Sequence, residues 1–215
     1  MIPLANFQTN AYYIGDYDGL GQTVRGNHHK INFNEFVSST VGAHAYPNVR
    51  KVDISPGADT VYLPYAQDQI YSVRLPQTNG PTFFCTANMS GCAFFIGVND
   101  HGRNVVFHAN SQRDSSERQM ASKRPSFQAD TTRVELDQLR NAAMLNHGDN
   151  VRIVGELRKS VYWRRVDDIV RTSSGFLGGT TVVGYRNGAK WDFWFQVWGS
   201  VNGGPITLIQ VAQFF

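Results

Sequence analysis

Cys92 and His108 are two side chains in one short stretch that could act together as a nucleophile and its base. A cysteine is mostly protonated at neutral pH because its ordinary pKa is about 8.5. An imidazole that accepts this proton leaves a thiolate, which attacks a carboxamide or peptide carbonyl and forms a thioester. The pair therefore predicts acyl-transfer chemistry. The alternative is that both residues only fill the inside of a β-hairpin, as buried Cys and His commonly do.

The register of that hairpin decides how close the two side chains come. Apolar runs flank the turn around Asp100, which predicts two antiparallel strands. A loop centred on Asp100 would place Cys92 directly across from His108, with Cβ atoms roughly 5 Å apart. His101 lies in the turn itself, nine residues from Cys92 at about 3.3 Å each, and is out of reach. The spacing therefore selects His108.

Residues around Cys92 could complete a catalytic site. Thr86 shares the strand parity of Cys92, and its hydroxyl could orient the imidazole or the substrate amide. Ser90 and Gly91 would let a substrate approach the backbone closely, and the amides from Ser90 to Cys92 could stabilise an oxyanion. Cys85 has the opposite parity and is predicted to be a small buried hydrophobe.

The elements that must position these residues are mainly strands. Short alternating or apolar runs bounded by Pro, Gly or Asp predict strands from Val49 to Ala109 and again from Val151 to the C-terminus, including 160–166. The chemistry of Asn187-Gly188 predicts a hairpin turn. A helix is expected over 133–146, with a Thr132/Glu135 capping box and Gly148 beyond its end, and shorter helices are expected near 34–44 and 114–124.

This order of elements predicts an α+β fold, a mostly antiparallel β-sandwich or mixed sheet with flanking helices. The 215 residues fit a single domain, and residues 1–48 are interpreted as its loop-rich N-terminal part.

Composition excludes several classes of function. A net charge of +3 without a clustered basic face argues against nucleic-acid binding. Two cysteines seven residues apart predict thiols rather than a disulfide framework. The N-terminus has no Sec-type signal peptide, and the apolar runs are too short to span a membrane. We therefore expect a soluble monomer without a metal or cofactor; a specialised secretion machine could still export it.

Other features have simpler explanations. His28-His29 could suggest a metal, but adjacent residues on an extended chain point apart, and no acidic or Cys cluster completes a site. His44 and His147 have no evident partners and are expected near the surface. A basic patch could be formed by Arg152, Lys159 and Trp163-Arg164-Arg165, or these could be solvated residues. Likewise, a carbohydrate-stacking platform or two covered strand faces could be formed by Trp191, Trp194 and Trp198.

A wider set of motifs resembles a known family. The stretches "VDISPGADTVYLPYA", "PTFFCTANMSGC" and "NVVFHA" are similar to Burkholderia lethal factor and, more distantly, to the catalytic domain of the cytotoxic necrotizing factors. That family has a catalytic Cys after Leu-Ser-Gly and a His on the following strand. Here the motif is Met89-Ser90-Gly91-Cys92, with Met in place of Leu. The resemblance is strong over 49–110 and patchy from there to the C-terminal hairpin.

The resemblance implies a bacterial toxin or effector that deamidates a specific glutamine of a host protein. Cys92 would be the nucleophile, His108 the general base and then acid, and Thr86 the third member of the site. It implies a target such as a translation factor or a Rho-family GTPase, reached by secretion or delivery into the host cytosol. A transglutaminase or cysteine protease would use the same pair, and a lectin-like β-sandwich with an incidental thiol is the alternative from another class.

Overall fold

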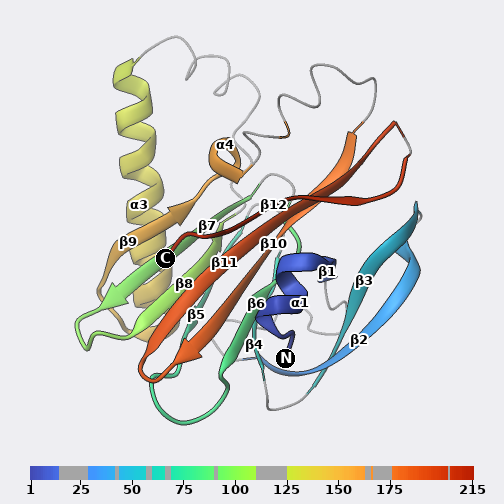
Figure 1. Ribbon diagram of the computed structural model, residues 1–215. Coiled ribbons are helices and arrows are strands. Elements are labelled where there is room, and N and C mark those ends of the chain that lie inside the picture. The colour runs from blue at the N-terminus through green and yellow to red at the C-terminus, as the bar shows by residue number, and fades with distance from the viewer. Residues whose placement is uncertain are drawn as a thin grey trace.

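The computed structural model describes residues 1–14, 29–41, 44–56, 60–65, 69–89, 92–109, 125–162, 166, 176–202 and 204–215, without the side chains of 29–56, 125–134, 176 and 177. Its helices are α1 (Leu4–Thr9), α3 (Pro125–His147) and α4 (Lys159–Tyr162), and its strands are β1 (Ala11–Ile14), β2 (His29–Val41), β3 (His44–Pro56), β4 (Thr60–Leu63), β5 (Ile70–Arg74), β6 (Phe83–Thr86), β7 (Ala93–Asn99), β8 (Asn104–Ala109), β9 (Val151–Leu157), β10 (Phe176–Asn187), β11 (Lys190–Val201) and β12 (Thr207–Gln213) (Figure 1).

The described strands form two sheets. The larger has the order β1-β3-β2-β4-β6-β10-β11-β12, and the smaller has the order β5-β8-β7-β9. Pairing is antiparallel except between β1 and β3 and between β4 and β6. The predicted β10–β11 hairpin is observed, but its turn lies one residue later than Asn187-Gly188: Asn187 pairs with Lys190, and Gly188 has a φ of 63° in the loop between them.

The two sheets pack face to face around one aromatic core. Alternate residues of each strand point into it, as the two-residue period of a strand requires. Phe84 from β6 contacts Phe94 from β7 at 5.8 Å between ring centroids, and Phe193 from β11 contacts both rings. The core is therefore built equally by the two sheets, and the prediction of an α+β sandwich is confirmed.

A helix covers the outer face of each sheet. Leu139 and Ala143 of α3 pack on Phe95, Val105 and other outward residues of the smaller sheet. On the larger sheet, α1 inserts Phe7 into a separate apolar cluster. Figure 1 shows α3 standing beside β9 and α1 lying across β10 and β6. The layers are thus helix, sheet, sheet, helix, with the candidate site in the interior.

The N-terminal region corrects the sequence interpretation. Residues 1–48 are not mainly loop, because they include α1, β1, β2 and the start of β3, and 34–41 is strand rather than helix. The run from Ile31 to Val41 pairs with β3 in a long hairpin. Its Ile, Val and Thr residues suit a strand, and this pairing outweighs the weak local helix pattern.

The helical predictions are also revised. Helix α3 begins at Pro125 rather than near residue 133, so Thr132 and Glu135 do not form a capping box. Its C-terminal end is as expected, with Gly148 at a φ of 67°. Leu145, near this end of the helix, is 85% exposed. The predicted strand at 160–166 is instead helical at Lys159–Tyr162, and the predicted helix at 114–124 lies outside the described residues.

Candidate active site

Thr86 and His108 meet across the two sheets. Thr86 ends β6 of the larger sheet, and His108 lies near the end of β8 in the smaller one. The Thr86 Oγ1 atom is 2.8 Å from His108 Nδ1, and the hydroxyl also lies 3.1 Å from the Ala87 carbonyl oxygen. The sandwich thus places the predicted third member directly on the predicted base.

These two contacts select one tautomer of the imidazole. A threonine hydroxyl has one proton to donate, and a carbonyl oxygen can only accept. Both bonds of Thr86 form together only if its hydroxyl donates to Ala87 and accepts from His108 Nδ1–H. His108 Nε2 then carries the lone pair. This atom is buried and has no hydrogen-bond partner in the part of the chain that the structure describes, so it is available to accept a proton.

Aromatic neighbours keep the imidazole in an apolar environment. His108 is paired with Phe94 on one side and with Tyr71 on the other, and its ring centroid is 5.4 Å from that of Tyr65. Only 1% of His108 is exposed. Burial disfavours the charged imidazolium and lowers the pKa of His108 to about 3. The imidazole is therefore neutral at physiological pH, as a general base must be.

Cys92 lies on the same face as His108, but in a register different from that predicted. The residue directly across from His108 is Phe94, two positions beyond Cys92. The hairpin is therefore not centred on Asp100, and Cys92 just precedes β7. A two-residue shift preserves parity, so Cys92 stays on the side of the hairpin that faces the other sheet, as His108 does through its bond to Thr86. It packs in the core between the sheets with 4% of its surface exposed.

Tyr162 is a site residue that the sequence interpretation missed. Its hydroxyl, carried by α4, donates to the Cys92 carbonyl oxygen at 2.9 Å. Burial raises the pKa of Tyr162, and the nearby Cys92 raises it further, so the phenol stays protonated as a donor. The predicted strand at 160–166 hid this contact, because no local pattern pairs Tyr162 with a cysteine 70 positions away.

Arg158 holds α4 in place. Its guanidinium bonds Glu135 of α3 at 2.7 Å and Glu156 of β9 at 3.0 Å, and it lies 5.0 Å from the centre of the Phe95 ring. Its carbonyl oxygen accepts the Tyr162 amide at 3.1 Å. One residue therefore connects α3, β9 and the segment that supports Cys92.

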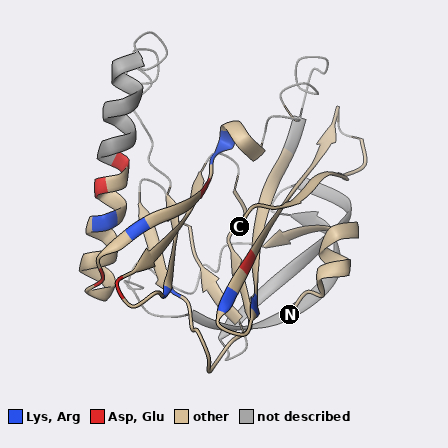
Figure 2. Cartoon of the chain, turned by 60° about the vertical axis from the view of Figure 1, so that its left-hand side comes forward, with Lys and Arg blue, Asp and Glu red and all other residues tan. Residues whose placement is uncertain are grey.

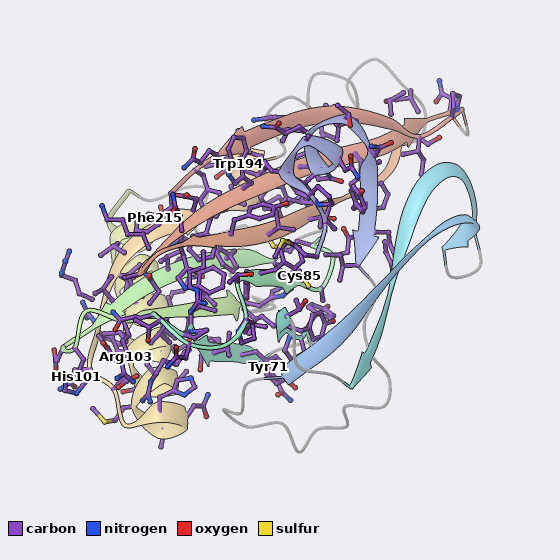
Figure 3. All side chains as sticks on the ribbon, turned by 60° about the horizontal axis from the view of Figure 1, so that its bottom comes forward. Tyr71, Cys85, His101, Arg103, Trp194 and Phe215 are labelled. Atoms are coloured by element: carbon purple, nitrogen blue, oxygen red, sulfur yellow. The ribbon has the colours of Figure 1, made fainter. Side chains whose placement is uncertain are left out.

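The remaining predicted residues have clear placements. Cys85 lies on the opposite face of β6 from Thr86, buried in the cluster beneath α1, as predicted. Figure 3 shows His101 at the outer tip of the β7–β8 hairpin, far from Cys85 in the interior. His101 is exposed there and takes no part in the site. Ser90 and Gly91, the proposed oxyanion segment, lie outside the described residues.

The tryptophans of β11 do not form one platform. Trp191 points into the core between the sheets, whereas Trp194 and Trp198 face the opposite side of the strand. Trp191 and Trp198 are 3% and 2% exposed. A stacking surface for carbohydrate needs neighbouring exposed rings, so the alternative of two covered strand faces agrees with the structure.

Two other sequence interpretations change. His147 was expected to have no partner, but its Nε2 lies 3.1 Å from the Ser72 hydroxyl, and its carbonyl oxygen accepts from Arg74 at 2.7 Å. Arg152 and Lys159 lie among side chains of both charges rather than in a basic patch. Figure 2 shows acidic and basic residues interspersed along β9 and α3. Residues 163–165 and His28 are outside the described part, as are the side chains of His29 and His44.

The described residues offer no second reaction centre of the expected kinds. Within them, no group of three or more His, Cys, Asp or Glu side chains could hold a metal ion. One surface pocket is lined by residues 74–79 with Arg103, and another by Arg140, Asn141, Met144, Asn150 and Val151, so neither includes Cys92 or His108. Among the helices that the structure describes, none is both long and apolar enough to cross a membrane.

The sequence was also compared with known proteins. No family model matches the chain, and no match is found among curated proteins. The functional argument therefore depends on the geometry of the site and on the motif resemblance.

Proposed function

We propose that the protein is a cysteine-dependent protein glutamine deamidase. The observation that carries the proposal is the Thr86–His108 bond, which leaves a buried, unpartnered Nε2 on the face that also bears Cys92. A neutral imidazole with its outer nitrogen unprotonated is the state that can deprotonate a thiol. The motif around Met89-Ser90-Gly91-Cys92 supplies independent support through its resemblance to deamidating toxins.

The reaction follows from these roles. His108 Nε2 accepts the thiol proton as Cys92 Sγ bonds to the side-chain carbonyl carbon of a glutamine. The proton then passes from Nε2 to the amide nitrogen, and the C–N bond breaks. Ammonia departs, and the substrate remains bound to Cys92 as a thioester. Nε2 next deprotonates a water that attacks the thioester. The thiol is regenerated and glutamate is released, so one water is consumed for each ammonia formed.

Thr86 and Tyr162 would position the two reacting residues. The hydroxyl of Thr86 fixes the imidazole tautomer, which must be maintained while Nε2 gains and loses a proton. Tyr162 anchors the main chain at the nucleophile. The oxyanion of each tetrahedral intermediate would be stabilised by backbone amides between Ser90 and Cys92, as the sequence predicts.

The proposed substrate is a protein of a host cell, and the protein would act as a bacterial toxin or effector delivered into the host cytosol. Conversion of a neutral glutamine into glutamate adds a negative charge, which is sufficient to disable an active site or a switch. The resemblance favours a translation factor or a Rho-family GTPase as the target.

The test is a search for converted glutamines. Host-cell lysate is incubated with the protein in heavy-oxygen water, and peptide mass spectrometry then looks for Gln→Glu changes that carry the heavy isotope. Cys92→Ser is the inactive comparison, and Cys85→Ala controls for loss of a thiol elsewhere. The proposal is supported if wild type and Cys85→Ala convert glutamines and Cys92→Ser does not. It is refuted if all three proteins give the same set of Gln→Glu peptides. Cross-linked or cleaved peptides would assign the same residues to a transglutaminase or a protease.

A further inference from the structure

A buried hydroxyl without a partner lies close to the candidate site. Thr180 of β10 is 0% exposed, and its Oγ1 atom makes no hydrogen bond to any residue that the structure describes. A buried polar atom that lacks a partner costs about 1–3 kcal/mol, so it is rare unless the group has a use. None of the roles assigned so far involves Thr180.

The side chain of Thr180 points between the two sheets. Along β10, Val182 faces the core between the sheets, whereas Thr181 faces α1 and donates to the Tyr12 carbonyl oxygen at 2.6 Å. Thr180 has the parity of Val182, and its partner on β11, Val197, is also part of that core. The unpartnered hydroxyl therefore lies in the same layer as Cys92 and His108.

Main-chain bonds connect Thr180 to the segment that leads into the nucleophile. The amide of Met89 bonds the Thr180 carbonyl at 2.7 Å, and the Thr180 amide bonds the Met89 carbonyl at 2.8 Å. Met89 is three residues before Cys92. The Cys85–Val183 pairing of β6 with β10 also places Thr86 beside Val182, two residues from Thr180. The inner face of the larger sheet, which faces the smaller sheet, thus carries Thr86, Met89 and the Thr180 hydroxyl.

The proposed reaction needs a hydrogen-bond donor on this inner face of the larger sheet. His108 Nε2 handles the proton of the thiol, but the carbonyl oxygen of the substrate becomes negatively charged and requires donors. The hydroxyl of Thr86 is already committed to Ala87 and His108. Among the described residues, the hydroxyl proton of Thr180 has no acceptor, and the Thr180 main chain bonds that of Met89, three residues before Cys92.

We propose that the Thr180 hydroxyl is an oxyanion donor, which bonds the side-chain carbonyl oxygen of the substrate glutamine and stabilises its charge in the tetrahedral intermediates. The inference rests on the proposed deamidase function and adds a residue to it. It assigns to β10 a side-chain donor that acts together with the backbone amides of the Cys92 segment.

Thr60 provides a matched control within the same chain. It is also a fully buried threonine whose hydroxyl has no partner. Thr60 pairs with Phe83 and shares the parity of Tyr62, both of which belong to the cluster beneath α1. Its hydroxyl therefore faces away from Cys92 and His108. Replacement of either threonine by valine removes an unpartnered hydroxyl, keeps the branched shape and should not lower stability.

The experiment compares Thr180→Val, Thr180→Ser and Thr60→Val with wild type. Three quantities are measured: kcat and KM for deamidation of a glutamine-containing substrate protein, the rate of Cys92 alkylation by iodoacetamide, and the melting temperature. We expect Thr180→Val to lose about 100-fold in kcat with little change in KM, as loss of one oxyanion donor does elsewhere. Alkylation forms no oxyanion, so its rate should not change. Thr180→Ser should restore most of the activity, and Thr60→Val should act as wild type.

Several results would overturn the inference. Full activity in Thr180→Val would remove the role outright. If Thr180→Val also lowered the rate of Cys92 alkylation, the Thr180 hydroxyl would act on the thiol rather than on the substrate oxyanion. If Thr180→Ser were as inactive as Thr180→Val, Thr180 would be only a packing residue. A wild-type protein that is alkylated rapidly at Cys92 but deamidates nothing would refute the proposed function itself, and the inference with it.

Discussion

The two cysteines of the chain occupy environments that differ in almost every property except burial. Cys85 lies on the α1 side of β6 among Phe7, Tyr62 and other apolar residues. Cys92 lies between the sheets, beside a histidine whose tautomer is fixed by Thr86. Desolvation raises the pKa of the Cys85 thiol far above its ordinary value, so that thiol stays protonated.

The difference predicts that two cysteines of similar burial will differ in reactivity. Cys85 packs in the apolar cluster beneath α1, where its sulfur serves as a small hydrophobic group. Cys92 is almost as buried, but an unprotonated imidazole nitrogen lies on its own face of the sandwich. A thiol becomes reactive where a base can deprotonate it. Cys85 lies on the α1 side of the larger sheet, whereas Cys92 lies on the other side, between the sheets, where His108 also points.

The largest expected contrast is in catalysis. Cys92→Ala should reduce deamidation at least about 1,000-fold, because the covalent route is lost. Cys85→Ala should keep near-normal kcat and lose about 1–2 kcal/mol of stability, since it removes only a small buried group. Both are measured with the same substrate protein and by chemical denaturation. Comparable losses of activity in the two variants would contradict the assignment of roles.

The second contrast is in alkylation. At neutral pH, Cys92 should react with iodoacetamide about 100-fold faster than Cys85, because only the thiolate reacts and Cys85 is held protonated. Quantitative mass spectrometry of the two peptides measures both rates in one sample. His108→Gln should bring the Cys92 rate down towards that of Cys85. Equal slow rates for both cysteines in the wild type would argue against any nucleophilic role.

A smaller effect is expected at the residue that fixes the imidazole. Thr86→Val removes the acceptor for His108 Nδ1–H and should lower kcat by about 10- to 100-fold, within the range of general-base contributions. Thr86→Ser keeps the hydroxyl and should retain most of the activity. If valine and serine variants were equally impaired, the methyl packing of Thr86 would matter rather than its bond.

The smallest effect concerns pH and stability. The folded-state pKa of His108, about 3, is below the ordinary value of 6.5, so between these pH values the unfolded chain binds a proton that the folded chain does not. Stability should therefore fall as the pH decreases from about 6.5 towards 3, by up to about 1.4 kcal/mol per pH unit. Denaturation at several pH values measures the slope.

Two variants test the source of that slope. His108→Gln should flatten it, because the substituted side chain does not titrate. Cys85→Ala should leave the slope unchanged, because burial raises the pKa of the Cys85 thiol and keeps it protonated throughout this pH range. A slope unaffected by His108→Gln would assign the pH dependence to other groups.

The sequence predicted which side chains face the interior better than it predicted the register that pairs them. Two-residue alternation correctly placed Thr86, Cys92 and His108 on inward faces, because parity survives a two-residue error in register. The register itself could not be read from the turn around Asp100, since pairing is set by packing against β5 and β9 as well as by the loop. Tyr162 could not be predicted, because its bond to Cys92 depends on how α4 lies over the sheets.

The fold class was predictable and the N-terminal region was not. Hydrophobic alternation in 151–157 and 176–213 corresponds to strands that are observed. The first 48 residues have weaker patterns, and β1 gains its structure from parallel pairing with β3, some 38 positions away in the sequence. Such long-range pairing leaves little local trace.

One buried side chain has a consequence for how the chain folds. The Gln196 amide group accepts from the Tyr12 main chain through Oε1, and its Nε2 donates to the carbonyl oxygens of Phe7 and Asn10. The first of these bonds spans 184 positions of sequence. Because β11 leaves the ribosome well after α1 and β1, these two elements can form their bonds to Gln196 only once most of the chain between them has been synthesised.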